Sequence, residues 1–386
     1  MSVHRKRIVS LILMVAIVFS ALSGAVLAAP EPEEIPSLKD TLDMFYIGTC
    51  VQSYELDNEK ITQQLLTHYN TITAGNEMKP DAILGRTPTI GPDGYPVLNF
   101  TNGDKIAQYA EENGLTLRGH TLVWHSQTPS WFFKEDYSTA GSAKNVDRDV
   151  MLERMEWYIK SVVEHFDTAF PGLIYAWDVV NEAAAENNVG MRGSNPAGGS
   201  GTSLWYETIG PDYVTYAFEY ARKYADESVL LFYNDYAING ALKRQSVIDL
   251  LMPAIEAGNV DGIGMQSHHH INMNIPGFEE SARVFATLVD HIDITELDCQ
   301  STTNPVEDGF LAQATWYHNF FESLKALKAD GVPIDNVVFW GMDDDTSWKR
   351  TGKPLLFDGD YNPKQAFWAI MGERGFRVRG ADRYRL

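Results

Sequence analysis

Trp177–Ala183 reads WDVVNEA and Ile292–Asp298 reads IDITELD, and these two stretches are the most informative part of the chain. Each is rich in apolar, β-prone residues, so each predicts a buried strand that presents one glutamate, Glu182 or Glu296, at its end. Barrel enzymes hold their reacting groups at the carboxyl-terminal ends of parallel strands. Two carboxylates that face each other there can break a glycosidic bond. The alternative is that both glutamates are surface or salt-bridged residues.

Eight apolar, β-rich segments alternate with amphipathic helical segments along the sequence. The predicted strands are Phe45–Val51, Thr71–Gly75, Thr116–Val123, Ile174–Asn181, Leu230–Asn234, Gly262–Gln266, Ile292–Glu296 and Val337–Gly341. The predicted helices include Ile106–Glu112, Met151–Phe166, Val214–Tyr224, Arg244–Glu256 and Thr315–Lys328. Alternating β and α segments predict a parallel sheet, and eight such units predict a closed (β/α)8 TIM barrel as a single catalytic domain. An open doubly wound sheet is the alternative, but no glycine-rich phosphate loop follows any of these strands.

The ends of the chain differ from this pattern. Three basic residues at positions 5–7 precede the apolar run Ile8–Phe19, and Val26–Ala28 offers a small-residue cleavage site. Residues 1–28 are therefore predicted to be a signal peptide, and the mature protein to be secreted, extracellular and soluble. An uncleaved membrane anchor is less favoured because polar and glycine residues interrupt the run early. We expect residues 29–371 to form the catalytic domain and the basic residues 372–386 to form a surface tail.

The charge balance indicates the kind of partner. The chain has 31 basic and 52 acidic side chains, a net charge of −21. Removing residues 1–28 takes away three basic side chains and no acidic one, so the mature charge is −21 − 3 = −24. This charge disfavours nucleic acids and anionic membranes and suits a neutral polymer as the substrate. We expect a monomer with no nucleic-acid partner and no membrane contact after the signal is removed.

Only two cysteines, Cys50 and Cys299, are present, which is too few for a disulfide scaffold. On the first and seventh strands of a barrel they would lie roughly 10 Å apart, beyond the ~7 Å limit for a disulfide. We expect two buried thiols.

Polar and aromatic residues gather at the predicted ends of the strands. They are Asn76, Lys79, His120, Trp124, Asn181, Glu182, Gln266, His268, Glu296, Asp298 and Trp340. A single histidine or tryptophan is more often a packed core residue than a ligand contact. Their recurrence at one strand end after another instead indicates a shared site at one end of the barrel.

The sequence resembles the family 10 glycoside hydrolases, which are retaining endo-β-1,4-xylanases. The resemblance runs from about residue 37 to residue 371 and includes WDVVNEA and ITELD. The other matching stretches, in order, are Gly75–Pro80 (GNEMKP), Arg118–Trp131 (RGHTLVWHSQTPSW), Leu231–Tyr236 (LFYNDY), Gly264–His268 (GMQSH) and Trp340–Trp348 (WGMDDDTSW). The resemblance implies hydrolysis of internal bonds in xylan or xylo-oligosaccharides, with no cofactor and no metal.

The resemblance also implies a role for each site residue. Glu182 would be the acid/base and Glu296 the nucleophile. Asn181 would bind the 2-hydroxyl of the reacting sugar, and Gln266 would lie near the nucleophile. His268, backed by Asp298, would orient Glu296. The residues implied to bind sugars on the glycone side are Asn76, Lys79, His120, Trp124, Trp340 and Trp348.

Elementary electrostatics supports this pair of roles. In a retaining enzyme the two carboxyl groups lie ~5–5.5 Å apart, so an ionised Glu296 is expected to raise the pKa of Glu182 by like-charge repulsion. Glu182 would then be protonated near neutral pH and could donate a proton to the leaving oxygen. Once Glu296 is esterified its charge is gone, and Glu182 could act as a base toward water.

Two runs of potential ligands suggest other readings. His268–His270 could bind zinc, but neighbouring residues of a strand point to opposite faces. Asp343–Asp345 lacks the spacing of a calcium loop, so a solvated loop is expected. A barrel metallohydrolase and a catalytically inactive carbohydrate-binding barrel are therefore the competing functions.

The roles of one loop and of one glycine stay open. Gly190–Ser203 (GMRGSNPAGGSGTS) is predicted to be a loop on the catalytic face, where it either borders the site or is a tolerated insertion. Gly75 stands where many relatives in the resembled family carry a glutamate that binds the second glycone sugar. Either that contact is absent here, or the backbone at Gly75 admits no β-carbon.

Overall fold

The computed structural model describes residues 35–195, 197, 199–301 and 307–372. The predicted signal peptide, residues 1–28, lies outside the described residues, and so does the predicted basic tail beyond Gly372. The described residues from Ser37 onward belong to one compact unit. Within the part of the chain that is described, no helix is long and apolar enough to span a bilayer.

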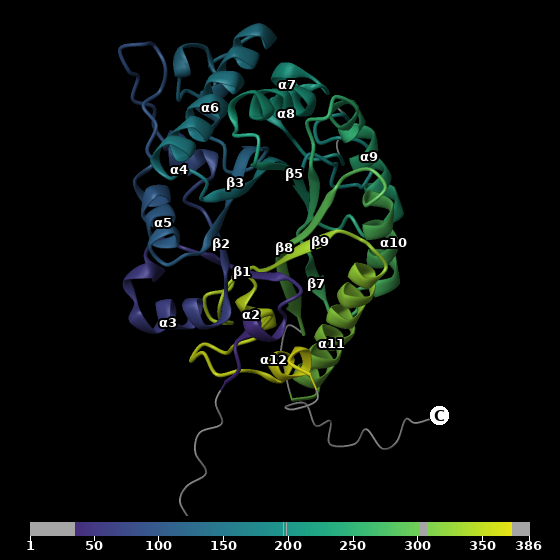
Figure 1. The fold of residues 1–386 in the computed structure, drawn as a ribbon. Helices are drawn as coiled ribbons and strands as arrows, with labels where there is room; N and C mark the ends of the chain where they lie inside the picture. The colour runs from purple at the N-terminus through teal and green to yellow at the C-terminus, as the bar shows by residue number, and fades with distance from the viewer. Residues whose placement is uncertain (1–34, 196, 198, 302–306, 373–386) are drawn as a thin grey trace, which may run out of the picture. The chain divides into compact units, whose positions relative to one another are not determined.

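Eight parallel strands close into a barrel, and helices surround them (Figure 1). The barrel strands are β1 (Tyr46–Val51), β2 (Thr71–Ala74), β3 (Thr116–Trp124), β4 (Ile174–Asn181), β5 (Leu230–Asp235), β6 (Gly262–Met265), β8 (His291–Gln300) and β9 (Ile334–Phe339). Successive strands pair in order, β6 pairs with β8, and β9 pairs with β1, which closes the ring. All eight predicted strands are present, and the predicted (β/α)8 barrel is confirmed.

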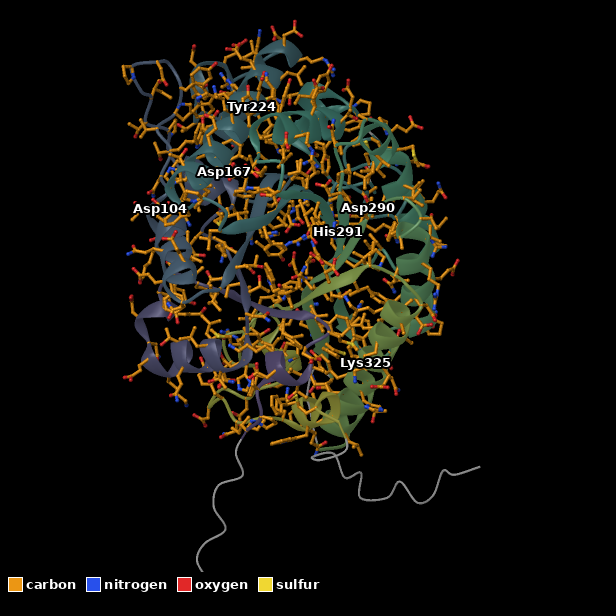
Figure 2. All side chains as sticks on the ribbon, viewed as in Figure 1. Asp104, Asp167, Tyr224, Asp290, His291 and Lys325 are labelled. Atoms are coloured by element: carbon orange, nitrogen blue, oxygen red, sulfur yellow. The ribbon has the colours of Figure 1, made fainter. Side chains whose placement is uncertain are left out.

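The helices follow the predicted alternation. Those over predicted segments are α5 (Thr101–Glu112), α6 (Arg148–Ala169), α8 (Tyr213–Tyr224), α9 (Ala241–Glu256) and α11 (Glu307–Ala329). The others are α2 (Leu38–Thr41), α3 (Glu59–His68), α4 (Pro80–Leu84), α7 (Leu204–Ile209), α10 (Ile275–Phe285) and α12 (Gln365–Ile370). Side chains such as Asp104 and Lys325 lie on this outer layer (Figure 2).

Helix α6 shows how the sequence produces the outer layer. Its first turn begins after Asp147, whose side chain accepts a hydrogen bond from the Val150 N–H. Ile159 and Phe166 are spaced by two helical turns and are buried on the face toward the barrel. The Phe166 ring lies 5.9 Å from the Trp177 ring of β4. This contact packs the helix against the middle of β4.

The interior of the barrel holds a buried ionic cluster. Arg118 of β3 pairs with Asp178 of β4 at 2.6 Å and with Asp293 of β8 at 2.7 Å. Asp178 also lies 2.9 Å from Nδ1 of His120. Because removing one partner of a buried ion pair leaves an uncompensated charge, this cluster fixes the relative positions of three strands. It also orients His120, one step nearer the open end of the barrel.

The two cysteines lie on β1 and β8 and are both free. Cys299 is buried, as expected. Cys50 is only partly buried, because it lines the cavity described below. The prediction of two buried thiols is therefore wrong for Cys50.

Candidate active site

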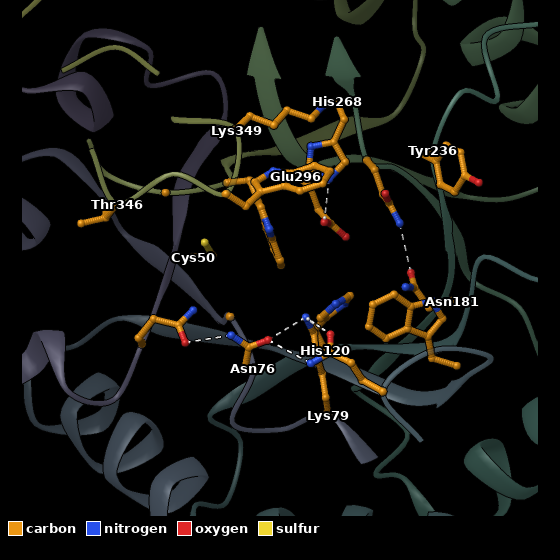
Figure 3. A pocket seen from close by; sticks show the side chains of 18 of the residues that line it. Cys50, Asn76, Lys79, His120, Asn181, Tyr236, His268, Glu296, Thr346 and Lys349 are labelled. Atoms are coloured by element: carbon orange, nitrogen blue, oxygen red, sulfur yellow. Dashed lines mark hydrogen bonds and ion pairs between the residues drawn. The ribbon is translucent and has the colours of Figure 1, made fainter. Parts of the chain in front are cut away.

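A cavity of about 850 Å³ opens at the carboxyl-terminal ends of the barrel strands (Figure 3). Most of the residues predicted for the site line it: Asn76, Lys79, His120, Trp124, Asn181, Glu182, Gln266, His268, Glu296, Trp340 and Trp348. Asp298 does not line the cavity but lies directly behind His268. The barrel thus brings together side chains from segments far apart in the sequence.

Glu182 follows the last residue of β4 and has a positive φ of 57°. Its backbone N–H donates to the Asn234 carbonyl at 2.9 Å, so the neighbouring strand holds the turn. Its carboxylate accepts hydrogen bonds from Nε1 of Trp124 and Nε2 of Gln266, both at 3.0 Å. Burial raises the pKa of Glu182, and the charge of Asp235 and then that of Glu296 raise it further. The expected direction is correct, but repulsion from Glu296 is a lesser cause.

Glu296 lies within β8 and is 5% exposed. Its Oε1 accepts a hydrogen bond from Nδ2 of Asn234 at 2.8 Å, and its Oε2 lies 3.1 Å from Nε2 of His268. Burial alone would raise the pKa of Glu296. The hydrogen bond from His268 and the positive charges around the carboxylate outweigh burial and lower this pKa. Glu296 is therefore ionised where Glu182 still holds a proton.

His268 connects Glu296 to Asp298. Its Nδ1 lies 2.7 Å from Oδ2 of Asp298, which also accepts from Nε1 of Trp348 at 2.9 Å. Lys349 lies 3.3 Å from the other oxygen of Asp298. Burial would lower the pKa of His268, but the two carboxylates raise it to about 9. At neutral pH the ring is an imidazolium that donates from both nitrogens.

Three side-chain amides link the two glutamates. The Asn181 amide lies 3.0 Å from Nδ2 of Asn234 and 3.3 Å from Nε2 of Gln266. Gln266 lies near the nucleophile, since its backbone carbonyl accepts from the Glu296 N–H at 2.9 Å, but its side-chain amide donates to Glu182. Asn234 is one of the site residues that were not predicted from the sequence. Its place at the end of a predicted strand, within the LFYNDY stretch, is the signal that could have identified it.

Aromatic and cationic side chains form another wall of the cavity. Nζ of Lys79 lies 5.0 Å from the ring centre of Trp124 and 6.0 Å from that of Trp340. The His120 ring meets the Trp340 ring edge to face at 5.4 Å. Flat aromatic faces suit the apolar faces of pyranose rings, while the cation suits their hydroxyl groups.

The Gly190–Ser203 loop contributes directly to the site. Arg192 is 2% exposed; its Nε donates to the backbone carbonyl of Glu182 at 2.8 Å, and its Nη2 donates to Oη of Tyr236 at 2.8 Å. Tyr236 lines the cavity and lies on the same side as Asn181 (Figure 3). Of the two readings of this loop, the structure favours the one in which it borders the site.

Neither candidate metal run forms a site in the structure. The His269 side chain packs against Trp316 and Phe320, away from His268. Asp343 and Asp344 are buried, Asp343 accepting backbone N–H groups and Asp344 pairing with Lys364 at 2.7 Å. The expected solvated loop is thus wrong for these two aspartates. Among the described residues, no group of three or more His, Cys, Asp or Glu side chains is arranged so that it could hold a metal ion.

The arrangement can supply a proton and a nucleophile at the same pH. One carboxyl group with a raised pKa and another with a lowered pKa, in one cavity, are the pattern of an acid and an ionised partner. The bridging amides and the imidazolium hold both groups in place.

Known proteins support the same reading of the chain. The family model described as glycosyl hydrolase family 10 matches residues 37–373. Endo-1,4-beta-xylanase A of Thermotoga maritima is 40% identical in an alignment of 352 residues that covers 88% of this chain and 31% of that protein. The chain therefore spans about a third of the length of this relative.

Two solved structures are also similar. An intracellular xylanase from Thermoanaerobacterium saccharolyticum, a mutant in complex with xylotriose, is 38% identical with a TM-score of 0.76, covering 88% of this chain and 99% of that one. Endo-1,4-beta-D-xylanase 10B of Clostridium thermocellum, in complex with xylohexaose, is 32% identical with a TM-score of 0.78, covering 87% and 67%. With a family model that matches nearly the whole described region, this chain belongs to glycosyl hydrolase family 10.

Proposed function

We propose that this protein is an endo-β-1,4-xylanase that cleaves internal bonds of xylan with retention of configuration. The observation that carries the proposal is the placement of Glu182 and Glu296 in one aromatic-walled cavity, where the pKa of Glu182 is raised and that of Glu296 is lowered. The xylotriose and xylohexaose bound to the similar structures support xylo-oligosaccharides as the ligands.

In the first step the Glu296 carboxylate attacks the anomeric carbon. The bond from that carbon to the leaving oxygen breaks, and the proton of Glu182 passes to this oxygen. The product is a glycosyl ester on Glu296. The hydrogen bonds from Asn234 and His268 hold the attacking carboxylate in one orientation before the reaction.

In the second step water attacks the anomeric carbon of the ester. Its proton passes to Glu182, now a carboxylate, and Glu296 leaves as a carboxylate. Esterification has removed the negative charge of Glu296, one of the charges that raise the pKa of Glu182. We assign the 2-hydroxyl of the reacting sugar to the Asn181 amide, which contacts the side-chain amides of Asn234 and Gln266.

Hydrolysis of xylan followed by reducing-sugar release and by proton NMR tests the proposal. The wild-type protein should release short xylo-oligosaccharides whose β-anomer is present before mutarotation, and a chelator should not reduce the rate. Release of the α-anomer first would show inversion instead. Binding of xylan without any release would favour a carbohydrate-binding barrel, and loss of activity with chelator would favour a metallohydrolase.

We also propose that the protein is exported, because residues 1–28 have the charge and apolar pattern of a signal peptide. The similar xylanase from Thermoanaerobacterium saccharolyticum is described as intracellular, so the question needs its own test. When the full sequence is expressed, the protein recovered from the medium should begin at Ala29 on N-terminal sequencing. Activity confined to the cell fraction, on protein that still begins at Met1, would contradict export.

A further inference from the structure

Gln52 is a polar residue of the cavity that neither the sequence motifs nor the proposed mechanism uses. It follows β1, and its backbone N–H donates to Oε2 of Glu55 at 2.7 Å. Its side-chain Oε1 accepts a hydrogen bond from Nδ2 of Asn76 at 3.0 Å. Both residues line the cavity. The carboxamide of Gln52 is thus held at the cavity wall by a partner from the next loop.

The space for this carboxamide exists because residue 75 is glycine. A β-carbon built on Gly75 would lie 1.9 Å from Nε2 of Gln52, far inside van der Waals contact. The backbone at Gly75 does not have a positive φ, so its conformation is open to any residue. The backbone conformation at Gly75 therefore does not demand glycine, whereas the absence of the glycone contact stays a prediction. The space next to Gly75 holds the carboxamide of Gln52.

Gln52 extends a row of hydrogen-bonding groups. Oδ1 of Asn76 accepts from Nε2 of Gln127 and from Nζ of Lys79, both at 3.2 Å, and Lys79 also lies 3.1 Å from Oε1 of Gln127. Among the described residues, Nε2 of Gln52 makes no hydrogen bond, although it is at the cavity wall. It can therefore donate to a ligand oxygen, and the row as a whole offers donors and acceptors to adjacent hydroxyl groups.

This row lies on the opposite side of the cavity from the proton donor's neighbours. In Figure 3, Asn76 is at one side, while Asn181 and Tyr236 are at the other. Glu182 follows Asn181 in the chain, and Arg192 donates both to its carbonyl and to Oη of Tyr236. In the proposed mechanism Glu182 protonates the oxygen of the leaving sugar. This row of hydrogen-bonding groups consequently faces the sugars that stay on the enzyme.

We infer that Gln52 is a specificity-determining residue, binding a hydroxyl of the second sugar on the glycone side, and that Gly75 is small so that Gln52 can reach it. The inference rests on the proposed function. It predicts that the two positions act as one unit, because a side chain at residue 75 displaces the same carboxamide that truncation of Gln52 removes.

A double-mutant cycle on two aryl glycosides tests this unit. An aryl xyloside carries one glycone sugar and an aryl xylobioside carries two. Gln52→Ala should lower kcat/KM on the xylobioside about two- to tenfold, the loss of one neutral hydrogen bond, and leave the xyloside nearly unchanged. Gly75→Ala should lower kcat/KM on the xylobioside by a similar factor. The double variant should lose no more than Gln52→Ala alone, since the contact is already gone.

Gln63→Ala, an exposed glutamine on α3, is the matched control and should leave both substrates unchanged. Equal losses on both substrates, or no loss with Gln52→Ala, would overturn the inference, as would additive losses in the double variant. If Gly75→Ala does not fold, judged by its melting temperature, the comparison of substrates with Gln52→Ala decides alone. A wild-type protein that hydrolyses neither glycoside would instead overturn the proposed function.

Discussion

His268 Nε2 lies 3.1 Å from Oε2 of Glu296, while the other ring nitrogen lies 2.7 Å from Asp298. The imidazolium is therefore held between two buried carboxylates, and their negative charges raise its pKa to about 9. Asp298 contributes more to this raised pKa than Glu296 does, so the two contacts together link the charge of His268 to the stability of the fold. This link can be measured as a function of pH.

The stability consequence has a defined pH range. A histidine whose pKa rises from 6.5 to about 9 on folding stabilises the protein fully below pH 6.5, and this stabilisation is lost as pH rises toward 9. The change is on the order of 3 kcal/mol. The gap in unfolding free energy between wild type and His268→Gln should therefore shrink between pH 6.5 and 9.5. His270→Gln, exposed on β7 (His268–His270), is the control; a gap that stays constant would contradict the assignment.

Replacing Glu296 with alanine should remove the nucleophile itself. Turnover on xylan should fall by several orders of magnitude, because no glycosyl ester can form. Azide should restore turnover on an activated aryl xylobioside and yield the α-glycosyl azide, since a single displacement inverts configuration. Near-normal hydrolysis of xylan by Glu296→Ala, measured as reducing sugar, would remove Glu296 from this role.

Glu182→Ala should separate the need for a proton from the need for a nucleophile. Ester formation should persist with a dinitrophenyl leaving group, which needs no proton, while cleavage of xylan is lost. Azide should then give the β-configured product. The measurement is kcat/KM on the dinitrophenyl substrate and on xylan. Equal losses on both would mean that Glu182 has another function.

The pH dependence of the reaction should respond to Asp235. Its charge is the second cause, after burial, of the raised pKa of Glu182, and its Oδ1 lies 2.8 Å from Nζ of Lys243. Asp235→Asn removes the negative charge and leaves the lysine uncompensated, and both changes lower the pKa of Glu182. The protonated acid is then lost at lower pH, so the basic limb of kcat/KM should move to lower pH.

The same variant should also lower the unfolding free energy by about 3–5 kcal/mol, because a buried charge loses its partner. Asp249→Asn, an exposed carboxylate on α9, should leave both the basic limb and the stability unchanged. A basic limb that does not move in Asp235→Asn would exclude this aspartate as a cause.

Arg192→Lys should disturb the position of Glu182. A lysine lacks the planar fork of donors with which the guanidinium reaches both the Glu182 carbonyl and Oη of Tyr236. We expect kcat/KM on xylotetraose to fall about ten- to hundredfold, with a smaller loss on a dinitrophenyl xylobioside. Glu186→Gln is the control, because that partner of Arg192 is 60% exposed and its ion pair contributes little. A similar loss with Glu186→Gln would point to the loop as a whole.

The strands could be predicted because their signal is local. The run from Ile174 to Asn181 is apolar and β-prone by itself, and its observed bounds match the predicted ones. Glu182 and Glu296 could be placed at one end of the barrel for the same reason, since parallel strands bring their carboxyl ends to one side. The short strand β7 was not predicted, because its pairing with Asp298, Cys299 and Gln300 depends on the partner strand rather than on its own composition.

The sequence by itself determined which chemistry this chain carries: eight strand-forming runs, two glutamates at strand ends and aromatic residues beside them. Only the tertiary structure decided which side chains are in contact. Asn234 reaches Glu296 across 62 residues, Arg192 leaves a glycine-rich loop to hold Glu182, and Gln52 fills the space beside Gly75. The physical reason is that propensity and periodicity act between neighbours in the chain, whereas side-chain contacts depend on where a closed barrel brings distant residues together.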